Sequence, residues 1–444
     1  MESGGLLKRL LLPIVFLCPL VAWAQSYNYD GPSVLSRGPR NLGVLGGENI
    51  RMNFFGSVNA IYDSGMYAFA ADEKGQLLDE AAYGVQIAGG ATGKQDFKRS
   101  SVALMYRGDY AYYTQKTYYN GFNHALSLSS VHQVNARLSI QIQAAAGSTN
   151  RAMGSYASTM YDPFDYNAVP AYELFNNQTA YGEGRVGASY RLSSRSQLQF
   201  GGSTFIVRRR ASGLVGMMGY TATGDFVRQI TRSTSIGGGY SFTNYRYSKM
   251  YGSSDLHTIT FSVQHRINRD WNIRAELSGF RIESTGLTRV ELDPIVAQIL
   301  GQGSGVEAFH NIYYLNAYRG SLSRSWRRAG LSIGAHRGVF PGNGVYLTSM
   351  TTGVTGNYSY QLGKWNVGVQ AGYDEWKSLT RSMYPYKNTS AGAGVSRQLT
   401  RIMHLTVSWD YRDMGSDLHT YDRTGQRASV GLTFSPPDVP LTMW

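Results

Sequence analysis

The residues with the clearest potential for chemistry are two acid–histidine pairs. Asp255 precedes His257 by two positions, and Asp417 precedes His419 in the same way, each within a Ser-Asp-Leu-His sequence. In a strand such residues share a face, so the carboxylate could orient the imidazole as a general base. The motif occurs twice, each time where a loop returns to a strand, and the eight histidines of the chain show no triad spacing. We therefore interpret the pairs as structural and predict that the protein is not an enzyme.

Metal and phosphate chemistry have no support in the sequence. No cluster of His, Cys and Asp has the spacing of metal ligands, and acidic calcium loops are absent. The run Gly237–Gly239 lies in a predicted strand, where glycine allows bending or close strand packing, and does not resemble a phosphate-binding loop. We expect neither a metal nor a cofactor.

A second group of charged residues lies in the middle of segments that alternate between apolar and polar positions. A charge that faces lipid costs ~2–4 kcal/mol at the bilayer midplane, so such residues should face an aqueous lumen. There, opposed arginines and acids would sort solutes by charge, although the alternative is a network that only fills and rigidifies the lumen. The group comprises Arg107, Asp109, Glu183, Arg185, Arg191, Asp225, Arg266, Arg274, Glu276, Asp374, Asp410 and Arg412.

The elements that must position these charges are short strands. Between Trp365 and Tyr373, for example, apolar residues alternate with polar or small ones, which is the pattern of a strand with one apolar face. From Asn49 to Phe434 the chain repeats a strand, a short turn, a second strand and a longer polar loop. We place 18 strands near 50–62, 82–92, 100–110, 123–133, 138–147, 179–192, 197–208, 218–230, 235–247, 256–267, 271–282, 311–325, 330–339, 350–362, 365–376, 389–399, 402–413 and 426–434.

The connections between these strands are of two alternating kinds. Short turns such as Ser193–Ser196 and Gly363–Lys364 alternate with long loops, the longest from about Ser148 to Asn177 and from about Glu283 to His310. An even strand number, short turns on one side and long loops on the other are typical of bacterial barrels, in which the short turns face the periplasm. Both ends of the predicted barrel then lie on the periplasmic side.

The N-terminus has the composition of a secretory signal. Lys8 and Arg9 precede the apolar run Leu10–Val21, and Ala22-Trp23-Ala24 supplies small residues for cleavage between Ala24 and Gln25. We divide the chain into a signal peptide (1–24), an extended segment (25–48), a barrel (49–434) and a tail (435–444). Cleavage would remove the single cysteine, Cys18, together with a net charge of +1, and would reduce the formal charge from +13 to +12.

Composition supports this organisation. The chain contains 33 Tyr and 52 Gly, which fits a barrel wall with aromatic girdles outside and small or polar residues inside. In an exported protein the basic excess points to an anionic solute, polymer or lipid headgroup, and nucleic acid is not an expected partner.

In pattern, the chain resembles an outer-membrane β-barrel of the porin type over Asn49 to Phe434. Its last strand, with Ala428, Val430, Leu432 and Phe434 on one face, resembles the aromatic-ended strand that the barrel-assembly machinery reads in this family. The tail after Phe434 departs from the family pattern, so Phe434 and Trp444 are both candidates for the recognition end. The resemblance implies an all-β, transmembrane, antiparallel up-and-down β-barrel of about 18 strands in the bacterial outer membrane. Its partners would be outer-membrane lipid, lipopolysaccharide and the assembly machinery.

The resulting functional hypothesis is a channel that allows small polar or anionic solutes to cross the outer membrane. Two alternatives stay open: the exit duct of an exopolysaccharide secretion assembly, and a structural or adhesin-like barrel that acts through its loops. The sequence does not fix the oligomeric state.

One long loop carries a helix signal of its own. Asp293 as N-cap, Pro294 at the first helical position and Gly301 after the end predict a short helix. A helix this short is not stable alone in water, so its apolar side chains need a surface, and the nearest is the lumen wall around Tyr313 and Tyr314. We predict that this loop folds inward and narrows the channel; the alternative is a cap on the barrel mouth or a contact with a neighbouring subunit. The apolar side chains are Ile295, Val296, Ile299 and Leu300.

Overall fold

The protein is an antiparallel barrel in which each strand pairs with its neighbours in the chain. The computed structural model describes residues 51–64, 81–114, 120–149, 178–210, 214–248, 252–291, 298, 304–340, 347–379, 385–416 and 422–435. The strands are β1 (Arg51–Ser64), β2 (Ala81–Asp96), β3 (Ser100–Tyr113), β4 (Gly121–Gln133), β5 (Leu138–Thr149), β6 (Thr179–Arg191), β7 (Ser196–Arg209), β8 (Met217–Gln229), β9 (Thr234–Tyr247), β10 (Gly252–Arg266), β11 (Trp271–Glu291), β12 (Ser304–Ser325), β13 (Ala329–Phe340), β14 (Ser349–Leu362), β15 (Trp365–Ser378), β16 (Tyr386–Gln398), β17 (Met403–Ser416) and β18 (Arg423–Phe434).

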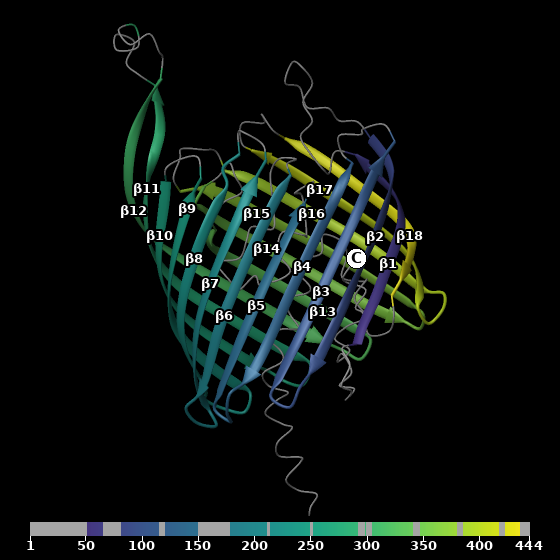
Figure 1. Cartoon of the computed structure of the whole chain (residues 1–444), viewed down its shortest axis with the longest axis horizontal. Coiled ribbons are helices and arrows are strands. Elements are labelled where there is room, and N and C mark those ends of the chain that lie inside the picture. The colour runs from purple at the N-terminus through teal and green to yellow at the C-terminus, as the bar shows by residue number, and fades with distance from the viewer. Residues whose placement is uncertain are drawn as a thin grey trace, which may run out of the picture.

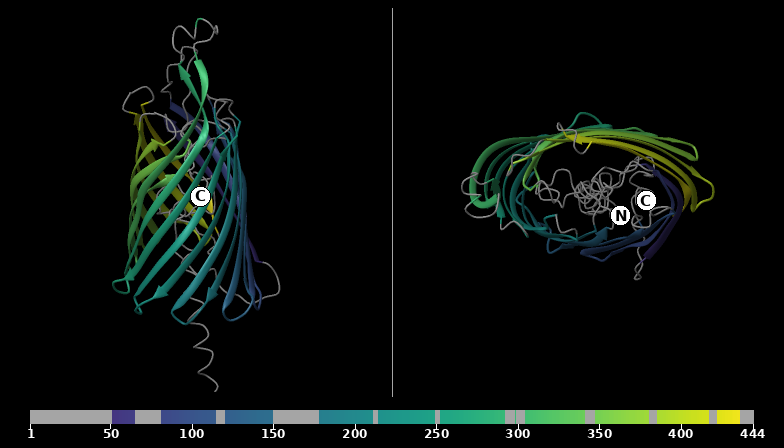
Figure 2. Two further views of the ribbon diagram at one scale, coloured as in Figure 1. Left: turned by 90° about the vertical axis from the view of Figure 1, so that its left-hand side faces the viewer. Right: turned by 90° about the horizontal axis from the view of Figure 1, so that it is seen from above.

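The first and last strands close the barrel. β1 pairs with β18 from Gly56↔Phe434 to Ser64↔Gln426, and on its other edge with β2, so that all the strands form one continuous 18-stranded sheet. The predicted strand number and closed antiparallel topology are confirmed (Figure 1). Seen from above, the barrel is flattened into an ellipse (Figure 2).

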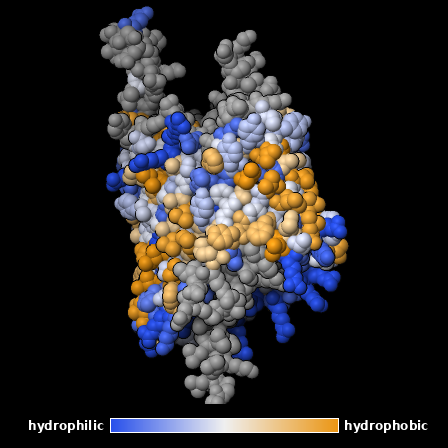
Figure 3. Space-filling view, turned by 45° about the vertical axis from the view of Figure 1, so that its right-hand side comes forward, coloured by the Kyte–Doolittle hydropathy of each residue, from blue (hydrophilic) through white to orange (hydrophobic). Residues whose placement is uncertain are grey.

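Alternation separates two faces of this wall. Large apolar side chains point outward and stay exposed, such as Ile259 (71%), Leu277 (63%) and Phe200 (55%), whereas their strand neighbours Thr258 and Ser278 are buried. Figure 3 shows hydrophobic residues gathered over the wall and hydrophilic ones toward its ends. This is the arrangement that a β-barrel needs in lipid, because closure satisfies the backbone hydrogen bonds and the outer side chains meet hydrocarbon. Among the described residues, we find no helix with the length and apolarity of a membrane span.

The predicted loop from Glu283 to His310 is wrong at both ends. β11 continues to Glu291 and β12 begins at Ser304, and the two strands pair as far as Glu291↔Ser304. They form a hairpin that projects beyond the rim of the barrel (Figures 1 and 2). A hairpin in water does not need one apolar face, so its strands lack the alternation by which the membrane-crossing strands are found in the sequence.

The eight short turns, from 97–99 to 399–402, lie at one end of the barrel, the short-turn rim, together with the start of β1 and the end of β18. The opposite ends of the strands, which the long connections join, form the other end of the barrel, which we call the outer mouth. The predicted signal peptide, its Ala24–Gln25 cleavage site and the extended segment lie outside the described residues, as does the tail after Ser435.

A closed barrel should be resistant to detergent. We expect the protein, folded in mild detergent, to migrate in gel electrophoresis as a compact species that boiling converts to a slower or faster one, with a β-rich circular dichroism spectrum before boiling. In a closed barrel no strand has an unpaired edge at which unfolding can begin, so the two species should not interconvert without heat. Identical mobility of boiled and unboiled samples would contradict a closed wall.

Candidate functional site: the lumen wall

The twelve charged residues singled out in the sequence all occupy positions that alternate with outward apolar ones, so they lie on the lumen side of the wall. Six of them are buried: Asp109, Glu183, Glu276, Asp374, Asp410 and Arg412. The other six, Arg107, Arg185, Arg191, Asp225, Arg266 and Arg274, keep more of their surface exposed. Arg191 and Arg266 end their strands at the short-turn rim, away from the clusters described next.

One cluster bridges the seam where the barrel closes. Arg427 on β18 donates from Nη2 to Gln86 Oε1 on β2 (2.8 Å), passing over β1, and Gln86 Nε2 donates to Asp109 Oδ2 on β3 (3.0 Å). Asn123 on β4 donates to the same Asp109 oxygen (2.8 Å). Asp109 is only 3% exposed, so this chain of polar side chains ties β18 to β4 inside the lumen. Of these residues only Asp109 was predicted from the sequence; Arg427, Gln86 and Asn123 were not.

A second cluster lies along a row of register partners from β12 to β15. Arg319 on β12 pairs with His336 on β13, His336 with Gly353 on β14, and Gly353 with Asp374 on β15. His336 Nε2 lies 3.7 Å from Asp374 Oδ1, because Gly353 between them has no side chain. Of this row only Asp374 was predicted from the sequence.

Gly353 is therefore expected to be required for this contact. A Cβ there would lie 2.1 Å from Asp374 Oδ1 and 2.9 Å from the backbone oxygen of Tyr373. Gly353→Ala should lower the free energy of unfolding by about 1–3 kcal/mol through overpacking. Denaturant titration of refolded protein measures this. Gly356→Ala on the same strand is the control, since its Cβ would meet nothing within 4 Å. Equal losses in both variants would contradict the packing argument.

Between these clusters the wall carries charges of both signs. Arg274 Nη2 and Glu276 Oε1 form an ion pair at 2.7 Å on β11, and Glu276 pairs in register with Arg319. Asp225 on β8 is the register partner of Gly239 on β9. The Asp225 carboxylate occupies the space that a side chain on Gly239 would need. The lumen therefore presents adjacent positive and negative groups rather than a surface of one sign.

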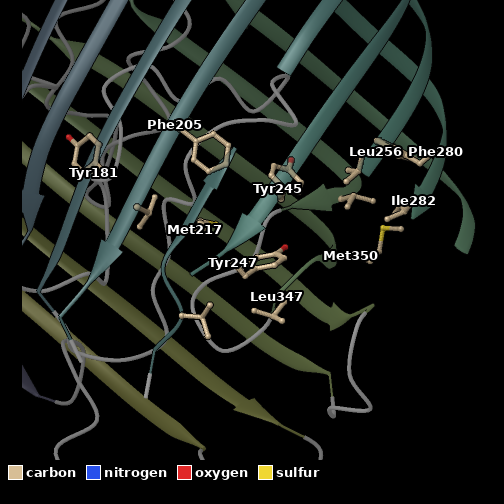
Figure 4. Close-up of a cluster of buried hydrophobic side chains, with 14 residues drawn as sticks. Tyr181, Phe205, Met217, Tyr245, Tyr247, Leu256, Phe280, Ile282, Leu347 and Met350 are labelled. Atoms are coloured by element: carbon tan, nitrogen blue, oxygen red, sulfur yellow. The ribbon is translucent and has the colours of Figure 1, made fainter. Parts of the chain in front are cut away.

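The outer half of the lumen differs from the expected wet, polar wall. From β6 to β12 the inward side chains near the outer mouth are apolar and pack together (Figure 4). The cluster consists of Tyr181, Phe205, Val207, Val215, Met217, Tyr245, Tyr247, Leu256, Phe280, Ile282, Ala317, Val339, Leu347 and Met350. Apolar side chains on an inner face need a covering layer, and the chain itself supplies one.

That covering layer comes from the ends of β13 and β14 and from residues 347 and 348, which precede β14. β12 and β13 pair only up to Tyr318↔Arg337, although both strands continue beyond this point. On β13 and β14, Ile333 and Val354 face outward. Val339 and Met350 have the same parity on these two strands, yet both are buried in the inward cluster. The ends of β13 and β14 therefore lie inside the ring formed by β9 to β12.

Residues 347–350, which we call the inner segment, are fixed to the lumen wall. Thr348 is fully buried, and its Oγ1 is 2.7 Å from both Tyr247 Oη and Ser254 Oγ. These wall residues lie on β9 and β10, whereas Thr348 precedes β14; four or five strand spacings amount to roughly 20–24 Å along the sheet. A direct hydrogen bond across that interval means that the inner segment crosses one end of the flattened lumen.

The constriction predicted from the sequence involves other residues. Asp293, Pro294, Ile295, Val296, Ile299 and Leu300 lie outside the described residues. The inner segment was not foreseen, because its signal is faint: apolar residues on both faces at the end of β13 and the start of β14. In the part of the chain that the structure describes, no group of three or more His, Cys, Asp or Glu residues is arranged to hold a metal ion.

The pairing of the strands, including that of β1 with β18, defines the fold. The fold is a closed, antiparallel, 18-stranded β-barrel. No protein-family model matches the chain, and no curated protein does. Among solved structures, a BenF-like porin from Pseudomonas fluorescens Pf-5 is 9% identical, with a TM-score of 0.45, over 87% of this chain and 99% of that one. OpdQ of Pseudomonas aeruginosa is 11% identical, with a TM-score of 0.43, over 88% and 98%.

A transporter is similar to the same degree. The ferric citrate transporter FecA in its unliganded form is 10% identical to this chain, with a TM-score of 0.45, over 83% of the chain. The match spans 61% of the length of that transporter.

Proposed function

We propose that this protein provides a passage for small polar or anionic solutes across the bacterial outer membrane. The observation that carries the proposal is the contrast between the two faces of one closed wall: apolar side chains outside, and the charged rows around Asp109, Glu276 and Asp374 inside. Charged side chains of both signs on a lumen wall select solutes by charge and orientation while leaving water in place.

Planar-bilayer recording tests the proposal directly. Purified protein should produce stepwise current increments in salt solution, and the reversal potential in a salt gradient should report the preference for anions or cations. A folded, heat-modifiable protein without current steps would contradict a passage and would favour a structural barrel that acts through its loops.

The proposed orientation places the short-turn rim in the periplasm and the outer mouth outside the cell, as short turns do in bacterial barrels. A cysteine at Lys387, near the start of β16, should react in intact cells with an impermeant thiol reagent. A cysteine at Arg232, in the exposed turn between β8 and β9, should react only after the outer membrane is permeabilised. The reverse labelling pattern would overturn the orientation.

A second candidate function, export of an anionic polymer, is favoured by the distribution of charge. The eight short turns contain ten Lys or Arg and one acidic residue, a net charge of +9. The nine long connections contain ten acidic and six basic residues, a net charge of −4. A positive entrance and a negative exit would attract a polyanion from the short-turn side and repel it from the other.

Blockade by polymer separates the two functions. For an export duct, an anionic polysaccharide should interrupt the current when added on the short-turn side and have little effect from the other side, more so at low salt. For a solute channel, addition of polymer to either side should leave the current steps unchanged.

A further inference from the structure

An arginine enclosed by two tryptophans lies on the outer surface at the short-turn rim. The Arg324 guanidinium carbon is 4.2 Å from the ring centre of Trp326 and 4.8 Å from that of Trp271. The two indoles meet edge to face, with ring centres 6.5 Å apart. Trp271 begins β11, Arg324 is near the end of β12, and Trp326 lies in the turn that follows. We call these three residues the Trp–Arg–Trp site.

The site faces the membrane rather than the lumen. Arg324 has the same parity on β12 as the exposed Tyr314 and Tyr318, and Trp271 has the same parity on β11 as the exposed Ile273 and Leu277. Tryptophan at the end of a membrane strand marks the level of the lipid headgroups. The guanidinium is therefore held at headgroup depth.

Arg324 has no counter-ion among the described residues. Its Nε is buried without a hydrogen-bond partner there, and its guanidinium stacks on the two indole rings. Stacking on aromatic rings uses the faces of the planar guanidinium and leaves its terminal N–H groups available for a bidentate acceptor such as phosphate. The missing partner is thus an anion.

Two further outward arginines lie at this rim. Arg397 on β16 stacks on Trp365 of β15 at 5.1 Å, again on the outward face, and Arg228 near the end of β8 is outward and exposed. With the basic short turns these residues form a positive belt at one headgroup level. A belt on the outer face of a barrel meets lipid before any soluble molecule.

We propose that the Trp–Arg–Trp site binds the headgroup phosphate of an anionic phospholipid in the membrane leaflet around the short-turn rim. The inference rests on the proposed membrane placement of the barrel, but not on conduction through it. The indoles fix the arginine at the depth of the phosphate, and the net negative charge of the lipid supplies the attraction that a zwitterionic lipid lacks.

Spin-labelled lipids measure the preference directly. In reconstituted vesicles of phosphatidylcholine, labelled phosphatidylglycerol should be retained at the protein surface in preference to labelled phosphatidylcholine. Arg324→Gln should reduce this preference by about fivefold at the affected site. Arg324→Lys should restore it only in part, because an ammonium keeps the charge but lacks the planar fork. Arg208→Gln is the matched control: an outward, exposed arginine at the opposite end of the barrel, on β7, where the preference should not change.

The other outcomes are equally informative. An unchanged preference in Arg324→Gln, or an equal loss in Arg208→Gln, would overturn the proposal. A change in the tryptophan fluorescence of the Trp–Arg–Trp site on addition of inorganic phosphate or an acidic peptide in detergent, without a response to phosphatidylglycerol, would also overturn the proposal. The occupant would then be a soluble anion. A variant that loses the lipid preference should still show current steps. A wild type that keeps the preference without conducting would refute the passage and leave the lipid site intact.

Discussion

Releasing the inner segment from the lumen wall should raise the single-channel conductance by on the order of twofold or more, because current is limited by the narrowest part of a pore. Leu347→Ser together with Thr348→Gly removes a buried apolar side chain and the hydroxyl that binds Tyr247 and Ser254. The strands on either side keep their pairing, so the barrel itself should stay closed. Planar-bilayer recordings of the variant and the wild type measure the difference.

The conservative pair Leu347→Ile with Thr348→Ser is the control. It keeps an apolar group and a hydroxyl in place, and its conductance should equal that of the wild type. Heat-modifiable migration of both variants would show that the wall is intact. If the released variant folds and conducts as before, the inner segment does not limit the current.

The loop with Pro294 remains a second proposed constriction, and the same recordings separate the two. Deleting Asp293 to Gly301 should raise the conductance if this loop folds into the lumen. Since β11 and β12 carry its stem beyond the rim of the barrel, the deletion leaves the inner segment and its hydrogen bonds to β9 and β10 in place. An increase in one variant alone would identify the narrower point, and increases in both would indicate two constrictions in series.

The membrane-crossing strands could be found from sequence because lipid imposes a rule on every second residue. From Trp365 to Tyr373 that rule gives the strand and the face of each side chain, and the strand structure agrees. Residues beyond the lipid are not subject to this rule. β11 and β12 continue past it as a hairpin in water, and the inward turn of β13 and β14 places Val339 and Met350 in an apolar cluster although their parity points outward.

The partners of the lumen charges could not be found in the same way. Parity shows that Asp109 and Asp374 face inward, but which residue lies beside each depends on the register between strands. A register shift of two residues preserves both faces while changing every neighbour. Gly353 illustrates the difficulty. Its lack of a side chain allows His336 to approach Asp374, and only the observed register shows that Gly353 lies between them.

The seam network provides the largest expected effect on stability. Asp109→Leu would leave Gln86 and Asn123 without the carboxylate oxygen to which both donate, at a site where the aspartate is 3% exposed. Each buried donor left without an acceptor costs about 1–3 kcal/mol, so we expect a loss of roughly 3 kcal/mol in the free energy of unfolding. Denaturant titration in detergent measures the loss, and the fraction of heat-modifiable protein should fall with it.

Asp109→Asn separates the loss of charge from the loss of the acceptor. An amide oxygen can still accept, so this variant should lose less than Asp109→Leu, by the difference between a charge-assisted and a neutral hydrogen bond. Tyr112→Leu is the control on the same strand, because Tyr112 is outward and 46% exposed and lies in the lipid-facing row. Closure depends on β1 being held between β18 and β2, and the bond from Arg427 to Gln86 spans that strand on the lumen side. If Asp109→Leu loses no more stability than Tyr112→Leu, backbone pairing alone stabilises the seam, and the hydrogen-bonded polar side chains only line the lumen.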